Sequence, residues 1–206
     1  MKQWICLLLA PLLSGLAAAH AQAADTRDPL SIVQETMTHT LAVIDERRDE
    51  FQADRGSLQK VVREDLLPLL DQEYSARLIL GKAGRGISQA ELDDFVHAMS
   101  TVLVNRYADG LLQFQSQNQV EVLPMKGKNT DKLTRVRTRI KLENGAYAPV
   151  DFAFRKTDAG WKAFDVTVEG ISYVITFRNQ IAPRVLADGI AKVTEDLIAG
   201  AIEINE

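Results

Sequence analysis

Side chains that could carry out catalysis are few and scattered along this chain. His39 and His97 fall in different predicted helices, and neither has a cysteine or carboxylate at the spacing of a metal site. Ser172 lies in Gly-Ile-Ser-Tyr-Val, which lacks the second glycine of a hydrolase elbow, and both histidines precede it. Asp93 and Asp94 are adjacent on a predicted helix, so their carboxylates point in different directions. We therefore predict no enzyme activity, no metal site and no cofactor.

Two other stretches have residue types found at anion-binding sites, a basic row and a glycine-rich loop. Arg135, Arg137, Arg139 and Lys141 alternate along one predicted strand. This row could dock an acidic partner or lie near lipid phosphate, but it could equally be a solvated sheet face balanced by neighbours such as Asp151. The glycines between 81 and 86 lack the spacing of a phosphate-binding loop, and no strand precedes them, so we predict a connector there.

The first residues resemble a secretory signal. Met1-Lys2 is a short basic start, and the stretch 4–19 is apolar but short for a bilayer span. Ala19-His20-Ala21 and Ala21-Gln22-Ala23 offer two overlapping small-x-small cleavage sites. We predict a cleaved signal peptide over residues 1–23 and a single domain over 24–206. Cys6 is the single cysteine, so the mature chain would have no thiol. A bacterial periplasm fits best, because a eukaryotic secreted protein of this size would more often carry disulfides.

The charge balance narrows the class of partner. The chain has 24 Lys and Arg residues against 28 Asp and Glu, a formal net charge of −4. Loss of Lys2 with the signal makes the remaining chain −5. This mildly acidic balance disfavours a dedicated nucleic-acid binder, and it disfavours permanent adhesion to anionic headgroups. We expect a monomer whose roughly 180 mature residues form one sizeable core.

The apolar spacing is helical up to about residue 114, alternates from 119 to 168, and is helical again afterwards. The first expected helix begins near Pro29 and ends at Gly56. Three more are expected over Ser57–Leu67, over Gln72–Leu80, and over a long segment from the Ser88 capping box to Phe114. Expected strands are Val120–Met125, Leu133–Leu142, Ala148–Arg155 and Gly160–Val168. Two further helices, Ile171–Ile181 and Pro183–Ala199, would be divided at Pro183.

Short turns between the strands require antiparallel pairing. In the last strand, Phe164, Val166 and Val168 would share one face, with Asp165 and Thr167 on the other. The sequence therefore predicts an α+β fold: a four-stranded antiparallel twisted sheet with helices packed on one face.

The run from Gly160, Gly-Trp-Lys…Phe-Asp-Val-Thr-Val-Glu-Gly-Ile-Ser, resembles the C-terminal signature of the MlaC / toluene-tolerance family. Phe177-Arg178-Asn179-Gln180 and Gly189 extend the resemblance, as do Leu80-Gly81-Lys82 and Asn105-Arg106-Tyr107-Ala108 in the long-helix region. The family usually has an aromatic-Arg pair after Leu-Gly-Lys, whereas here Ala83 and Gly84 precede Arg85.

The resemblance implies a periplasmic phospholipid carrier of the pathway that maintains lipid asymmetry. It implies an NTF2-like fold with extra helices and an internal apolar cavity for acyl chains. It also implies two partners: an inner-membrane ABC transporter complex with its membrane-anchored lipid-binding subunit, and an outer-membrane lipoprotein–porin complex.

The residues expected to line the cavity come from the long helix, the sheet and the segment after it. They are Val96, Met99, Leu103, Tyr107, Leu111, Val136, Ile140, Phe152, Phe154, Phe164, Val166, Val168, Ile171, Tyr173 and Val174. Ordinary core residues have the same periodicity, so the stripes alone do not distinguish lipid contacts from packing. Two other interpretations stay open: an NTF2-like enzyme, which needs an Asp or His in the cavity, and a structural or chaperone-like module with a filled core.

Overall fold

The computed structural model describes residues 26–114, 119–126, 129–142 and 144–204. The predicted signal peptide, residues 1–23, lies outside the described residues. The helices are α1 (Pro29–Glu46), α2 (Arg48–Ala53), α3 (Arg55–Val61), α4 (Gln72–Leu80), α5 (Gln89–Tyr107), α6 (Tyr173–Asp188) and α7 (Ile190–Ile198). Short turns of other helix types are η1 (Val62–Leu66), η2 (Leu67–Leu69), η3 (Gly81–Gly84) and η4 (Ala108–Gln113). No described helix is long and apolar enough to cross a membrane.

The strands form an antiparallel meander in the order β1 to β5. They are β1 (Val120–Val122), β2 (Leu133–Lys141), β3 (Tyr147–Thr157), β4 (Gly160–Val168) and β5 (Ile171–Ser172). The prediction of four strands is therefore wrong, because Ile171 and Ser172, expected to begin a helix, pair with the end of β4. A strand of two residues is too short to leave a periodic signal in the sequence.

The sheet register confirms most of the predicted alternation. Val136 is opposite Phe152 in β3, and Phe152 is opposite Val166 in β4, so these three side chains lie on one face. A β-bulge interrupts the pattern in β4: Asp165 pairs with Ala153 but Ala163 pairs with Phe154, which leaves Phe164 without a partner in the register. The alternation predicted for Phe164 is therefore wrong.

At the bulge, β4 packs against α4, a segment distant in the sequence. The ring of Phe164 packs edge-on against Tyr74, with ring centroids 5.3 Å apart. The carbonyl of Phe164 accepts a hydrogen bond from Ser75 Oγ at 2.8 Å. Leu70 forms a parallel bridge with Ala163 beside it. The bulge thus joins β4 to the chain that enters α4.

Capping side chains set the helix beginnings. Asp28 accepts hydrogen bonds from the N–H groups of Leu30 and Ser31 at the start of α1. The predicted capping box of Ser88 and Glu91 at the start of α5 is confirmed. The predicted end of the first helix at Gly56 is wrong: α1 ends at Glu46, and Gly56 lies inside α3, which Asp54 caps.

The predicted division of the last helices is also wrong. Pro183 lies inside α6, which continues to Asp188, and the chain breaks at Gly189 with φ of 83°. Proline removes one backbone hydrogen bond, but Ile181 and Val185 are buried on either side of Pro183. Gly189 takes the left-handed conformation that glycine adopts without a Cβ penalty.

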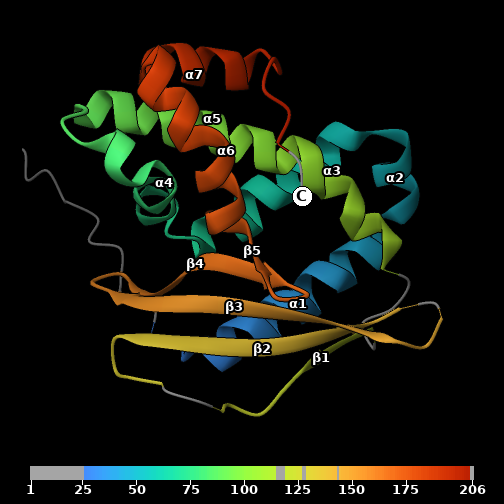
Figure 1. The fold of residues 1–206 in the computed structure, drawn as a ribbon. Coiled ribbons are helices and arrows are strands. Elements are labelled where there is room, and N and C mark those ends of the chain that lie inside the picture. Colours follow the sequence, from blue (N-terminus) through green and yellow to red (C-terminus); the bar gives the residue numbers. More distant parts are fainter. Residues whose placement is uncertain (1–25, 115–118, 127–128, 143, 205–206) are drawn as a thin grey trace, which may run out of the picture.

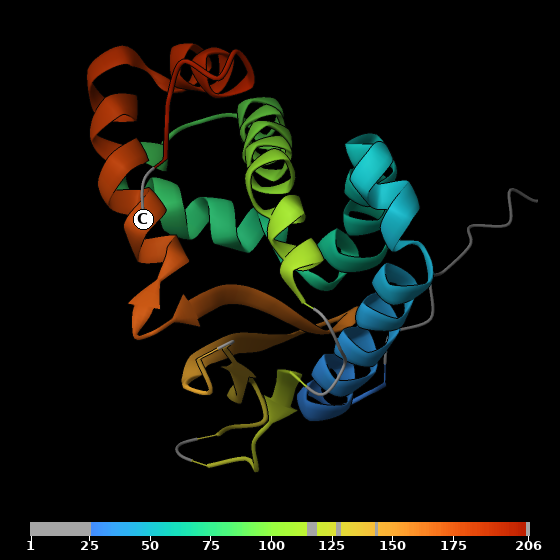
Figure 2. The same ribbon diagram turned by 90° about the vertical axis from the view of Figure 1, so that its right-hand side faces the viewer.

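Helix α1 packs on one face of the sheet, while α4, α5, α6 and α7 gather beyond the β4 edge; among the described residues no helix crosses the other face over β2 (Figure 1). The view in Figure 2 separates α1 from the group of α4 to α7. The buried apolar side chains form three separate clusters. The first cluster lies among helices α4, α5, α6 and α7. The second joins the end of α1 with α2, α3 and the end of α5, and the third lies between α1 and the sheet.

Candidate functional site

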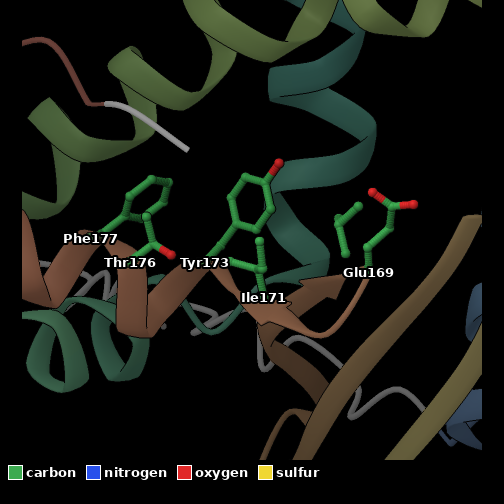
Figure 3. A pocket seen from close by; sticks show the side chains of 6 residues that line it. Glu169, Ile171, Tyr173, Thr176 and Phe177 are labelled. Carbon is green, nitrogen blue, oxygen red and sulfur yellow. The ribbon is translucent and has the colours of Figure 1, made fainter.

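The chain makes a tight corner where β4 turns into β5 and then into α6. Glu169 and Gly170 form the turn, with φ of 49° and 86°, the left-handed values of a two-residue hairpin loop. Glu169 is the single described non-glycine residue with positive φ. The turn places Ile171, 56% exposed, two residues before the start of α6. Figure 3 shows Glu169, Ile171 and Tyr173 projecting to the same side of this segment.

A pocket of about 90 Å³ lies at this corner. Its lining residues are Val168, Glu169, Ile171, Tyr173, Thr176 and Phe177 (Figure 3). The carboxylate of Glu169 and the hydroxyl of Thr176 give the lining some polar character, and the other side chains supply apolar surface. Pockets for small organic ligands usually measure about 300–1,000 Å³. In this structure the pocket therefore has room for part of an acyl chain but not for a whole one.

A hydrogen-bonded cap holds the start of α6 against β4. Ser172 Oγ donates to Asp165 Oδ2 at 2.6 Å and accepts from the Ile175 N–H at 3.2 Å. Asp165 Oδ1 accepts from the Val174 N–H at 3.1 Å. Two of the first N–H groups of the helix are thereby satisfied. Asp165 and Ser172 thus fix where Tyr173 leaves the sheet.

Three aromatic rings continue from the pocket into the helices. Tyr173 contacts Phe177 of α6 with ring centroids 5.6 Å apart, and Tyr107 of α5 at 5.5 Å. Both pairs are edge-to-face, an arrangement that the ring quadrupole favours. Because Tyr107 ends α5 and Tyr173 begins α6, these rings connect the two helices at the side that faces β4 and β5.

The residues predicted on the long helix separate into two clusters. Met99 is buried in the cluster of α4 to α7, and Val96, Leu103 and Tyr107 are half-buried against it. Leu111 lies beyond α5 in η4 and packs against the cluster of α1, α2 and α3. The helical stripe extrapolated to Phe114 therefore does not form one continuous wall.

The residues predicted on the sheet also differ in their surroundings. Val136 and Phe154 are buried under α1, and Phe152 packs against the same cluster. Ile140, Val166 and Val168 are half-buried on that face, and Phe164 is half-buried against Tyr74. In the segment after the sheet, Val174 is buried among the helices. The pocket brings together three of the predicted residues, namely Val168, Ile171 and Tyr173.

Three pocket residues were missing from the prediction: Glu169, Thr176 and Phe177. The spacing of Tyr173 and Phe177, one helical turn apart, is a signal that could have indicated the second ring. Glu169 left no such signal, because its position depends on a left-handed turn that the sequence indicates only through the glycine that follows. Among the described residues, no group of three or more His, Cys, Asp or Glu side chains could hold a metal ion.

The fold belongs to a known class of α+β protein. It matches a solved phospholipid-binding protein from Ralstonia solanacearum, determined in complex with a phospholipid, with a TM-score of 0.73. The match covers 83% of this chain and 95% of that protein, at 20% sequence identity. At this identity the likeness establishes the shared fold.

The sequence assigns the family. The family model described as MlaC protein matches residues 34–199, and the chain belongs to the MlaC family. It is 24% identical over 176 residues to the intermembrane phospholipid transport system binding protein MlaC of Haemophilus influenzae, covering 84% of this chain and 80% of that protein. It is 25% identical over 186 residues to the toluene tolerance protein ttg2D of Pseudomonas putida, covering 90% and 86%.

Proposed function

We propose that this protein is a periplasmic phospholipid carrier that binds acyl chains between its sheet and its helices and moves lipid between two membranes. The observation that carries the proposal is the family match over residues 34–199. The name of the Haemophilus influenzae relative, a phospholipid transport binding protein, supports the same role. The phospholipid held by the Ralstonia solanacearum protein of the same fold supports the choice of cargo.

The free energy of the cargo explains why such a carrier needs an apolar interior. Each methylene removed from water is worth about 0.8 kcal/mol, so two sixteen-carbon chains represent on the order of 20 kcal/mol. A diacyl lipid therefore does not cross an aqueous compartment alone at a useful rate. The carrier must replace most of that burial, while the headgroup can stay in water.

The corner of β4, β5 and α6 is the proposed position at which this interior begins. Val168, Tyr173 and Phe177 supply apolar surface there, and Ile171 extends it to the outside. Since the pocket holds about 90 Å³, loading must enlarge it by separating side chains that now touch. The half-buried Val166 and Leu103 are proposed to belong to the enlarged wall.

The proposed partners are those that the family resemblance implies. Lipid would pass to or from an inner-membrane ABC transporter complex with its membrane-anchored lipid-binding subunit, and an outer-membrane lipoprotein–porin complex. The transporter would use the ATP. In this role the chain binds and releases lipid as a monomer and performs no catalysis.

Extraction of the purified protein with organic solvent, followed by mass spectrometry, tests the proposal. We expect diacyl phospholipid in stoichiometric amount when the protein is purified from the periplasm of its producing cell. A lipid-free protein that also takes up no phospholipid from mixed micelles would contradict the carrier role and favour a structural module with a filled core.

A further inference from the structure

The basic row of β2 lies on the sheet face opposite α1, and in the described part of the chain no helix covers β2 on this side. Val136 on the opposite face is 0% exposed beneath α1, whereas the side chains of Arg135 and Arg139 are 55% and 40% exposed. Figure 1 shows β2 and β3 from the side opposite α1, and no helix crosses this face. The row runs from Arg135 to Lys141, about 20 Å at about 3.3 Å per residue.

Acidic residues neutralise only part of the row. Arg135 Nη1 lies 3.5 Å from Asp151 Oδ2, and Arg139 Nη2 lies 2.6 Å from Glu121 Oε2. Arg137 reaches no carboxylate among the described residues: its Nη2 donates to the Pro124 carbonyl at 3.1 Å, and its buried Nε has no acceptor. Lys141 likewise has no ion pair within the described part of the chain. Two of the four basic residues in the row therefore form an ion pair with an acidic side chain.

This local excess is opposite in sign to the rest of the molecule. Outside the row and its two acidic partners the chain has 20 basic and 26 acidic residues. A protein with such an asymmetry turns its basic face towards an anionic surface and its remainder away from it. The net charge of −4 disfavours permanent adhesion to an anionic surface.

Large apolar side chains are exposed at both ends of the same face. Leu133, 50% exposed, begins β2, and Tyr147, 46% exposed, is opposite Lys141 at the start of β3. The guanidinium of Arg139 lies over the Tyr147 ring, 4.2 Å from its centroid. Arginine binds phosphate through its planar fork of donors, tyrosine is enriched at the membrane–water interface, and leucine can enter the boundary between headgroups and acyl chains.

From this arrangement we propose that the exposed sheet face, with Arg135, Arg137 and Arg139 at its centre, docks transiently on an anionic phospholipid bilayer. The inference rests on the proposed function in one respect, because a phospholipid carrier has to come close to bilayers. A bilayer fits this face better than an acidic protein does. The row is long and evenly spaced, and exposed apolar side chains stand at both of its ends.

Vesicle sedimentation with the purified protein tests the docking. The probe is a vesicle of equal parts phosphatidylcholine and phosphatidylglycerol, compared with one of phosphatidylcholine alone. We expect binding to the anionic vesicle at about 10 mM salt, where the Debye length is about 30 Å, and loss of binding near 1 M, where it is about 3 Å. The variant with Arg135→Gln, Arg137→Gln and Arg139→Gln should bind at least about fivefold more weakly, the factor one basic residue contributes near an anionic leaflet.

A matched control removes the same charge elsewhere. Arg63, Arg85 and Arg184 are exposed and have no ion pair within the described residues, so their triple change to Gln alters only the net charge. This control variant should keep most of the vesicle binding. A variant with Lys in place of the three row arginines should also bind, unlike the variant with Gln at these positions. Equal losses in both Gln variants would overturn the proposal, since net charge alone would then decide.

Two further outcomes count against the docking proposal specifically. The first is no binding of the unaltered protein to anionic vesicles at low salt. The second is binding to polyglutamate with none to the vesicles, which would assign the face to an acidic protein. Both are distinguishable from failure of the proposed function, because co-purified lipid is measured separately and does not depend on the arginine row.

Discussion

Tyr107 and Tyr173 contact each other edge to face across the junction of α5 and α6, with ring centroids 5.5 Å apart and an interplanar angle of 67°. The two residues are far apart in the sequence, at the end of one helix and the beginning of another. Tyr173 also lines the pocket at the β4–β5 corner. The aromatic contact therefore connects the candidate site to the helical part of the molecule.

This contact should be measurable as a coupling energy. Tyr107→Ala and Tyr173→Ala are each expected to lower the free energy of unfolding by about 1–3 kcal/mol, because each removes a half-buried ring. In the double variant the two losses should differ from additivity by about 0.5–1.5 kcal/mol, the value of one aromatic pair. Urea unfolding of the four proteins provides the measurement. Strict additivity would mean that the rings do not support each other.

A charge at the pocket mouth should remove bound lipid without unfolding the protein. Ile171 is 56% exposed, so Ile171→Glu places a carboxylate where water can reach it while spoiling the apolar entrance. We expect loss of co-purified phospholipid, measured by mass spectrometry, with secretion and the unfolding transition unchanged.

The control for this change is Ile198→Glu in α7, where the isoleucine is 59% exposed and does not line the pocket. It should keep the normal amount of lipid. Phe152 was also predicted to line the cavity, but Phe152→Glu is a less selective test. Its carboxylate would enter the cluster between α1 and the sheet and destabilise the fold. Normal lipid in the Ile171→Glu protein would contradict the assignment of the mouth.

The bulge in β4 predicts a ranking of two phenylalanine deletions. Phe154 is buried under α1, so Phe154→Ala should cost about 3–5 kcal/mol of unfolding free energy. Phe164 is half-buried and packs edge-on against Tyr74, so Phe164→Ala should cost about half as much. Tyr74→Ala should make the Phe164 change milder, whereas it should leave the Phe154 change unaltered. Equal costs for the two deletions would place Phe164 in the inner wall of the sheet instead.

The capping box of α5 predicts part of the acid sensitivity. The hydrogen bonds that the Ser88 N–H and hydroxyl donate lower the pKa of Glu91 below its ordinary value of 4.5. A carboxylate with a lowered folded pKa contributes stability that is present above its unfolded pKa and lost as the pH falls through the folded value. Unfolding free energies at neutral pH and below pH 4 should therefore differ less in Glu91→Gln than in the unaltered protein.

Glu203→Gln is the charge-matched comparison for that series, since Glu203 is exposed and lies outside every described helix and strand. It should leave the acid-induced loss of stability unchanged. Part of that loss will persist in Glu91→Gln, because hydrogen bonds from Ser31 and from Ser57 likewise lower the pKa values of Asp28 and Asp54. An identical pH dependence in both variants would show that the box at Ser88 does not contribute.

Local rules succeeded where one short segment contains the whole signal. Ser88 and Glu91 are three residues apart, and their capping box formed as expected. The alternation of β2 also held, because Val136 and its neighbours follow a simple period of two. These features need no information about distant parts of the chain.

The failures occurred where distant segments decide. The bulge at Phe164 depends on Tyr74 and Ser75 of α4, which lie about ninety residues away along the chain. Pro183 was expected to end a helix, yet buried neighbours on both sides keep it within α6. The left-handed conformation of Glu169, which brings its carboxylate to the pocket, could not be seen in the residue types. The size of the pocket could not be predicted from the sequence either, because it depends on how these distant segments pack together.

The division of the interior into three clusters has a mechanical meaning. Helix α5 contributes Met99 to one cluster and Val104 to another, so it is shared by two of the three clusters. If the proposed lipid enters between two clusters, each cluster can keep its own apolar contacts. Lipid entry between clusters would then disturb fewer apolar contacts than the opening of one continuous core.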